Sequence, residues 1–235
     1  MTEALFDLSE EYEAMLNQGI RLSGESMQFF LDGRLSLLRS RLEDLSRVSR
    51  ILDFGCGLGY TSKRLHSMFP GAEVTGVDTS QRALETAREK NGGPGIRFLD
   101  ARELHSVKGE YDLCYVNGVF HHIPPEDRPG VLQTIHRALR EDGKLALFEN
   151  NPWNFGARMV MSRIPFDRGA QMLSPSDART LLKLSGFEVH RTDSLFFFPR
   201  FLEALRFLEP ALGPTLLGAQ YLVLAAAPGA SSREA

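Results

Sequence analysis

The stretch Ile51-Leu52-Asp53-Phe54-Gly55-Cys56-Gly57-Leu58-Gly59 decides the fold of this 235-residue chain. A run typical of a buried strand passes into a turn with glycine at every second position, and a segment of helical character follows. Glycine in such a turn lets the backbone come close to a nucleotide at the carboxyl end of the first strand of a parallel sheet. The stretch therefore predicts a strand, a ligand-binding loop and a helix.

Short apolar runs alternate with helical patterns after this loop. We expect strands at residues 51–54, 73–77, 96–99, 112–116 and 144–148. Helical periodicity marks 80–90 and 126–139 between them, and 27–48 before them. Because such alternation joins parallel strands through crossover helices, the chain predicts a doubly wound α/β sheet with helices on both faces. A further helix is expected over 174–186, and further strands over 187–197 and 221–226.

Composition and charge exclude several classes of partner. The chain has 27 basic and 30 acidic residues, a net charge of −3, so it has no basic excess for a nucleic acid or an anionic membrane. Its two cysteines, Cys56 and Cys114, lie far apart in apolar runs, as buried free thiols do in a reducing cytoplasm. Neither a secretory leader nor a membrane-spanning run is evident. We expect a cytoplasmic protein without stable membrane insertion, and peripheral membrane contact stays open.

The spacing of the glycines narrows the kind of ligand. A dinucleotide fingerprint would need its third glycine where Tyr60 stands. No Gly-Lys-Ser or Gly-Lys-Thr follows the loop, so the phosphate-cradling pattern is also absent. The loop therefore favours neither hydride chemistry nor a nucleoside triphosphate.

The stretch from Asp53 to Gly59 resembles the first motif of the class I S-adenosylmethionine-dependent methyltransferases. Val77-Asp78, Leu99-Asp100-Ala101 and Val119-Phe120-His121-His122-Ile123-Pro124 extend the resemblance, the last in the manner of the small-molecule branch. The similarity is close over 48–149 and looser over 174–226. It implies a Rossmann-like, mostly parallel seven-stranded sheet whose last strand is antiparallel. It also implies S-adenosylmethionine as the cofactor and S-adenosylhomocysteine as the product.

The resemblance assigns the cofactor contacts residue by residue. Asp78 is expected to accept hydrogen bonds from both ribose hydroxyls, and Asp100 to meet the adenine amino group. Asp53 is expected to help hold the methionine amino group. Each acid alone fits an ordinary turn, but at the ends of three successive strands they define one crevice. The other expected contacts are Gly55, Cys56, Gly57, Gly59, Thr79, Ala101, Asn117 and, from an N-terminal lid, Tyr12.

Two adjacent histidines are the candidate catalytic residues. His121 and His122 follow the fourth predicted strand, where the resemblance places the methyl group. Histidine titrates in the range useful for proton transfer, so either ring is a candidate general base or a donor that orients the acceptor. The alternative is a structural pair that bonds backbone groups and packs the next loop.

Asn117 separates subfamilies of methyltransferases. Enzymes that methylate DNA or protein amides carry two prolines after the corresponding polar residue, and this chain has Gly118 and Val119 instead. Catechol-type enzymes place a magnesium-binding acid nearby, and Asn117 is not an acid. We expect no metal dependence, although Glu149 stays open as a ligand.

Segments outside the core are expected to enclose the acceptor. We predict an N-terminal helical cap or lid over 1–47, a methyltransferase domain over 48–227 with inserts at 150–173 and 199–219, and a disordered tail over 228–235. The apolar part of the second insert could line a pocket, meet a lipid-linked substrate, form a dimer face or bury itself against the sheet. The first insert is expected to contact substrate or, alternatively, to be a surface loop. Its candidate residues are Trp153, Asn154, Arg158 and Met159.

These observations predict an S-adenosylmethionine-dependent methyltransferase that acts on a small-molecule acceptor. Hydroxyl oxygen in a biosynthetic or tailoring pathway is the favoured target, by analogy with the family. The alternatives are N- or C-methylation of a small or lipid-linked molecule, and a regulatory module that binds the cofactor without turnover. Monomer and homodimer are both open.

Overall fold

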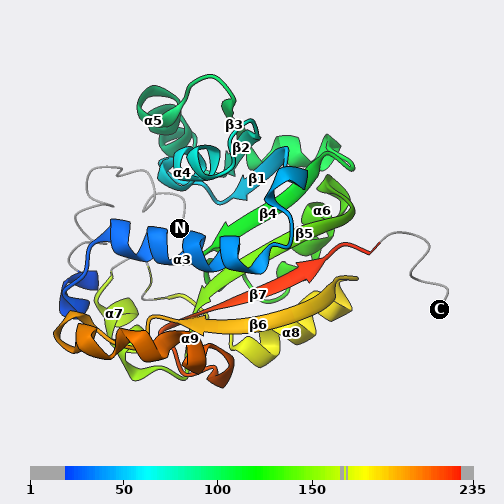
Figure 1. Ribbon diagram of the computed structural model, residues 1–235. Helices are drawn as coiled ribbons and strands as arrows, with labels where there is room; N and C mark the ends of the chain where they lie inside the picture. Colours follow the sequence, from blue (N-terminus) through cyan, green and yellow to red (C-terminus); the bar gives the residue numbers. More distant parts are fainter. Residues whose placement is uncertain (1–18, 165–166, 168, 229–235) are drawn as a thin grey trace.

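A seven-stranded sheet with the order β3-β2-β1-β4-β5-β7-β6 organises the protein, as the computed structural model in Figure 1 shows. The structure describes residues 19–164, 167 and 169–228. Strand β7 pairs antiparallel with β5 and β6, and the other pairs are parallel. The predicted doubly wound sheet with its last strand antiparallel is confirmed. The strands are β1 (Arg50–Phe54), β2 (Glu73–Asp78), β3 (Ile96–Asp100), β4 (Tyr111–Asn117), β5 (Leu139–Asn150), β6 (Glu188–Leu195) and β7 (Gln220–Ala226).

Helices cover both faces of this sheet (Figure 1). Apolar side chains of α3 and α4 pack on one face, against β1, β4, β5 and β7. Those of α6 and α8 pack on the other, and α5 packs on Phe98 of β3. The helices are α3 (Met27–Arg41), α4 (Tyr60–Met68), α5 (Gln81–Asn91), α6 (Arg128–Ala138), α7 (Phe155–Arg163), α8 (Pro175–Leu184) and α9 (Glu209–Leu212).

Short 3₁₀ segments connect many of these elements. They include η3 after β3 and η4 after β4, so both lie at the carboxyl edge of the sheet. The second predicted insert folds mainly into η6, α9 and η7. The segments are η1 (Arg21–Ser23), η2 (Leu45–Arg47), η3 (Ala101–Ser106), η4 (Phe120–His122), η6 (Arg200–Leu208) and η7 (Gly213–Thr215).

Three boundaries differ from the sequence prediction, each for a local reason. Helix α3 ends at Arg41 because the chain turns extended and Asp44 then accepts a hydrogen bond from the backbone of Ser46. The first insert, in which no periodicity was evident, contains α7, and the Asn154 side chain caps it. Strand β5 begins five residues early, at Leu139, directly after α6.

The N-terminal part of the described chain belongs to the core. Leu35 and Leu38 of α3 are buried against the sheet, and Arg34 Nε donates to Tyr115 Oη of β4 over 3.2 Å. The part of the predicted lid that contains Tyr12, and the tail over 229–235, lie outside the described residues. Within the described residues, no helix is long and apolar enough to cross a membrane.

Candidate functional site

The loop after β1 depends on glycines in the left-handed backbone region. Gly55 and Gly59 have φ of 76° and 81°. A Cβ at Gly55 would lie 2.3 Å from Val119 Cγ2, and one at Gly59 would lie 2.6 Å from Phe98 Cζ, so larger residues would clash as well as strain the chain. Gly57, with φ of 50°, has no atom within 4 Å of the corresponding position. The middle of the loop therefore leaves open space where a ligand can approach the backbone.

A cavity of about 1120 Å³ opens beside this loop, at the carboxyl ends of β1, β2, β3 and β4. Its volume slightly exceeds the range for sites that hold a drug-sized ligand, roughly 300–1,000 Å³. It brings together ten of the residues expected from the sequence. They are Gly55, Gly57, Asp78, Thr79, Ala101, Asn117, His121, His122, Asn154 and Met159.

Asp78 connects the second strand to the glycine loop. Its Oδ2 accepts a hydrogen bond from Gly57 N over 2.8 Å, and its Oδ1 accepts one from Ser80 N over 3.0 Å. Burial raises the pKa of this carboxyl, and the backbone donors oppose that rise. Asp78 thus presents a carboxylate at the cavity wall, next to the open space at Gly57, and its contact with the ribose hydroxyls stays a prediction.

Other expected cofactor residues lie behind the cavity wall. Asp53 points beneath the loop, where its Oδ2 accepts a hydrogen bond from Ser62 Oγ over 2.6 Å. Burial raises the pKa of Asp53 to about 7. Asp100 is bound by Arg102 and Gln81, and the Arg102 guanidinium lowers its pKa to about 2. Asp53 and Asp100 do not line the cavity among the described residues, and neither do Cys56 and Gly59, so their cofactor contacts stay predictions.

Two of the four expected substrate residues line the cavity, and the other two lie on the surface. Asn154 and Met159 line the cavity, whereas Trp153 and Arg158 are exposed to solvent and lie outside its lining. Each exposed residue is followed directly in the chain by one that lines the cavity, so neighbouring side chains point in different directions. Contacts of Trp153 and Arg158 with a substrate stay predictions.

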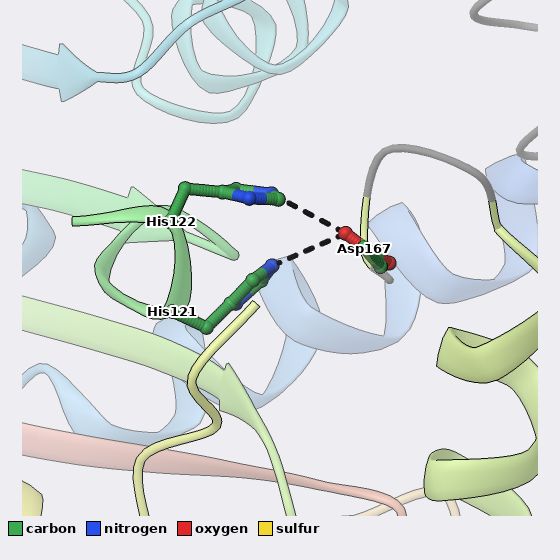
Figure 2. A group of neighbouring side chains, drawn as sticks. All are labelled: His121, His122 and Asp167. Carbon is green, nitrogen blue, oxygen red and sulfur yellow. Dashed lines mark ion pairs between the residues drawn. The ribbon is translucent and has the colours of Figure 1, made fainter. Parts of the chain in front are cut away.

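His121, His122 and Asp167 form a cluster whose side chains Figure 2 shows, and all three line the cavity. The histidines belong to η4, directly after β4, and both rings point toward Asp167. Asp167 Oδ1 lies 3.5 Å from His121 Nε2 and 3.3 Å from His122 Nε2. The structure thus joins the predicted histidine pair to an acid that the sequence did not single out.

Glu149 of β5 holds His121 from the side opposite Asp167. Its Oε2 lies 2.6 Å from His121 Nδ1, and its Oε1 accepts a hydrogen bond from Phe120 N over 2.7 Å. Burial lowers the pKa of His121, but Glu149 and Asp167 outweigh it and raise that pKa to about 10. Burial raises the pKa of Asp167, and its contacts with the two histidines bring it below its usual range. His121 is therefore an imidazolium at neutral pH in this state.

Sequence reasoning missed two buried charges at the cavity. Asp167 lies in the insert without periodicity, 46 positions after His121, and nothing local links the two. Arg34 lines the cavity from α3, and its Nη1 donates to Gln220 Oε1 over 3.1 Å. The only signal for Arg34 was a charge within an apolar helical pattern, which also fits a solvated face.

Comparison with known proteins agrees with this geometry. Residues 51–143 match the family described as a methyltransferase domain. Malonyl-[acyl-carrier protein] O-methyltransferase 1 of Ilyobacter polytropus is 29% identical over 168 residues, which are 69% of this chain and 62% of that protein. Release factor glutamine methyltransferase of Deinococcus radiodurans is 31% identical over 182 residues, 72% of this chain and 63% of that protein. The chain thus spans less than two thirds of the length of these curated relatives.

Solved structures agree on the fold. A methyltransferase of Thermotoga maritima, described as a possible histamine N-methyltransferase, has a TM-score of 0.68 and 20% identity, and the match covers 97% of this chain and all of the other. An S-adenosylmethionine-dependent methyltransferase of Mesorhizobium loti has a TM-score of 0.61 and 23% identity, with coverage of 83% and 99%.

The fold, the glycine loop and the family match place this domain among the class I S-adenosylmethionine-dependent methyltransferases. The cofactor of that class is S-adenosylmethionine, and its product is S-adenosylhomocysteine. The family resemblance read from the sequence is confirmed.

Proposed function

We propose that the protein transfers a methyl group from S-adenosylmethionine to an oxygen atom of a small molecule with a large apolar part. One observation carries the proposal. The same cavity is lined by the glycine loop, by the histidine cluster and by aromatic side chains. A donor and an acceptor can therefore meet in one cavity.

At the donor end, Gly57 and Asp78 are the residues that would hold the cofactor. S-adenosylmethionine supplies a methyl group on a positively charged sulfur, which is already a good leaving group. The protein's part is therefore to align the two reactants and to keep water away, since these effects lower the barrier without further chemical activation.

At the acceptor end, phenylalanines from two distant parts of the chain form an apolar wall. The rings of Phe30 and Phe196 pack edge to face with centroids 4.9 Å apart, and Phe29 lies beside both. An acceptor with an apolar body would bury that body here, at roughly 25 cal/mol for each Å² removed from water. The phenylalanines of the wall are Phe29, Phe30, Phe196, Phe197, Phe198 and Phe201.

The histidine cluster supplies the polar part of the acceptor site. A hydroxyl acceptor must be oriented and must lose its proton, and a positioned acid–base group typically contributes 10²–10⁴-fold to such a step. His121 is locked between Glu149 and Asp167, so we assign it an orienting role. The pair of His122 and Asp167 is our candidate for receiving the proton. The names of two relatives, malonyl-[acyl-carrier protein] O-methyltransferase and trans-aconitate 2-methyltransferase of Enterobacter sp., favour an oxygen or carboxylate acceptor.

The size class of the acceptor, the compartment and the kind of pathway are inferred from the sequence. A net charge of −3 and the missing prolines after Asn117 favour a small acceptor over nucleic acid, in a cytoplasmic biosynthetic or tailoring pathway. Peripheral contact with a membrane is compatible with the exposed Phe201 and Phe207, and monomer and homodimer are equally compatible with the proposal.

A methyl-transfer assay tests the proposal. The protein is incubated with S-adenosylmethionine labelled in the methyl group and a panel of hydroxylated and carboxylated molecules with apolar bodies, and products are located by mass spectrometry. We expect label on oxygen. Label on nitrogen or carbon would contradict the acceptor assignment. Tight cofactor binding with no transfer to any member of a broad panel would favour the regulatory alternative.

A further inference from the structure

The cluster of His121, His122 and Asp167 also has the features of a metal site. We propose that these three side chains bind one divalent transition-metal cation at the acceptor end of the cavity. The inference departs from the metal-independent enzyme that the sequence led us to expect. Its catalytic role rests on the proposed function: a cation here would polarise the acceptor oxygen so that its proton leaves to solvent, with His122 and Asp167 as metal ligands in place of proton acceptors.

The spacing of the three potential ligand atoms fits a shared cation. One ligand atom from each residue lies within 4.8 Å of the others. Asp167 Oδ1 lies 3.3 Å from His122 Nε2 and 3.5 Å from His121 Nε2, beyond the usual 2.9–3.0 Å of an N–H···O hydrogen bond. Two ligands on a tetrahedral cation with bonds of about 2.1 Å lie roughly 3.4 Å apart. Both distances therefore suit two ligands of one ion better than a donor and its acceptor.

Glu149 contacts His121 in the way that a carboxylate commonly contacts a metal-binding histidine. A histidine that coordinates a metal through one ring nitrogen usually donates its other N–H to a carboxylate, which fixes the tautomer and the ring. Here Glu149 Oε2 lies 2.6 Å from Nδ1 of His121, and Phe120 N donates to the other oxygen of Glu149. Nε2 of His121 is thereby directed at Asp167.

The burial and the charge of these side chains also favour a bound cation. Glu149, Asp167 and His121 have side chains that are 0%, 5% and 4% exposed. Asp167 Oδ1 accepts no hydrogen bond of ordinary geometry from the part of the chain that the structure describes. A buried carboxylate oxygen without a donor is costly unless a positive charge meets it. A dication bound by Asp167 would balance the two buried carboxylates.

The ligand set indicates the class of cation and an open coordination position. Two imidazole nitrogens and one carboxylate suit first-row transition metals, whereas Mg²⁺ and Ca²⁺ prefer oxygen ligands alone. All three side chains line the cavity, so the remaining coordination positions face the space for the acceptor. Three protein ligands with an open position are typical of catalytic rather than structural sites.

Metal content measured on tag-free protein tests the proposal. The protein is equilibrated with Zn²⁺ or Co²⁺, dialysed, and analysed by elemental mass spectrometry and by the visible absorption of Co²⁺. We expect about one ion per chain for the wild type. Asp167→Asn and His122→Asn should bind at least tenfold more weakly, and Glu149→Gln should be weakened 10- to 100-fold. His190→Asn, at an exposed histidine, is the matched control and should bind as the wild type does.

Two results would overturn the site: a wild type that retains no Zn²⁺ or Co²⁺, or an Asp167→Asn variant that binds as tightly as the wild type. Calorimetry with S-adenosylhomocysteine on the same samples reports whether each variant is folded. It also separates the two proposals. Loss of the metal with intact cofactor binding refutes only the metal site, whereas absence of cofactor binding in a metal-binding wild type refutes the methyltransferase.

Discussion

Glu149 Oε2 lies 2.6 Å from Nδ1 of His121, and both side chains are buried. This pair fixes the ring of His121 at the end of β4 from the neighbouring strand β5, so the sheet itself positions the acceptor end of the cavity. The pair also has a testable energetic consequence.

Replacement of Glu149 by alanine should destabilise the fold by about 3–5 kcal/mol, because it removes the nearer of the two carboxylates that face the buried His121. Glutamine keeps the side-chain volume and one oxygen, which can serve Phe120 N or His121 Nδ1 but not both, so Glu149→Gln should cost less, about 1–3 kcal/mol. Urea unfolding of both variants measures the difference. Equal losses would contradict this expectation, since they would mean that the retained oxygen and volume of glutamine contribute nothing.

His121→Ala should lower turnover by about 10²-fold, because it loses the orientation of the acceptor, while cofactor affinity stays nearly the same. The reason is that we assign His121 to the acceptor and the glycine loop to the cofactor, although both line the same cavity. Turnover is measured with labelled S-adenosylmethionine, and affinity by calorimetry with S-adenosylhomocysteine. Unchanged turnover would remove His121 from the catalytic site and leave it a structural role.

The stability of the cofactor-free protein should depend on pH through Asp53. Its pKa is raised from 3.8 to about 7 in the folded state, so the folded protein binds more protons than the unfolded chain between these values. The contribution of Asp53 to stability therefore falls as pH rises from about 4 to about 7 and stays low above that. Asp53→Asn should flatten this part of the profile, as urea midpoints from pH 4.5 to 8 would reveal. Parallel profiles for wild type and variant would disprove the shift.

A side chain at Gly57 should block the cofactor without unfolding the protein. The left-handed backbone at Gly57 makes a larger residue cost about 1–2 kcal/mol, and its side chain would enter the space beside the loop. Gly57→Arg should abolish binding of S-adenosylhomocysteine. Gly71→Arg is the matched control, because Gly71 also has positive φ and open space around it but lies in the turn before β2, away from the cavity. Equal binding by both variants would refute the assignment of the loop.

The sequence predicted the parts of this protein that local patterns encode. The strand from Ile51 and its glycine loop follow from apolar residues and from backbone angles that only glycine adopts easily. The helix start at Ser174 follows from a cap whose side chain accepts a hydrogen bond from Asp177 N, as the structure confirms.

The acceptor end of the site could not be predicted in the same way. Asp167 reaches His122 only because the chain after α7 returns to the carboxyl edge of the sheet, and no local pattern encodes that return. Glu149 gave a weak signal as an acid at the end of an apolar strand, but its partner His121 lies 28 positions earlier, on the neighbouring strand's end. Both contacts are products of tertiary packing.

The most direct test of the central claim is a calorimetric titration of the purified protein with S-adenosylmethionine and with S-adenosylhomocysteine. We predict that both bind with a stoichiometry of about one per chain and that the Gly57→Arg variant binds neither, while the Gly71→Arg control binds as the wild type does. Absence of binding to folded wild-type protein would contradict the assignment of the cavity as a methyltransferase site.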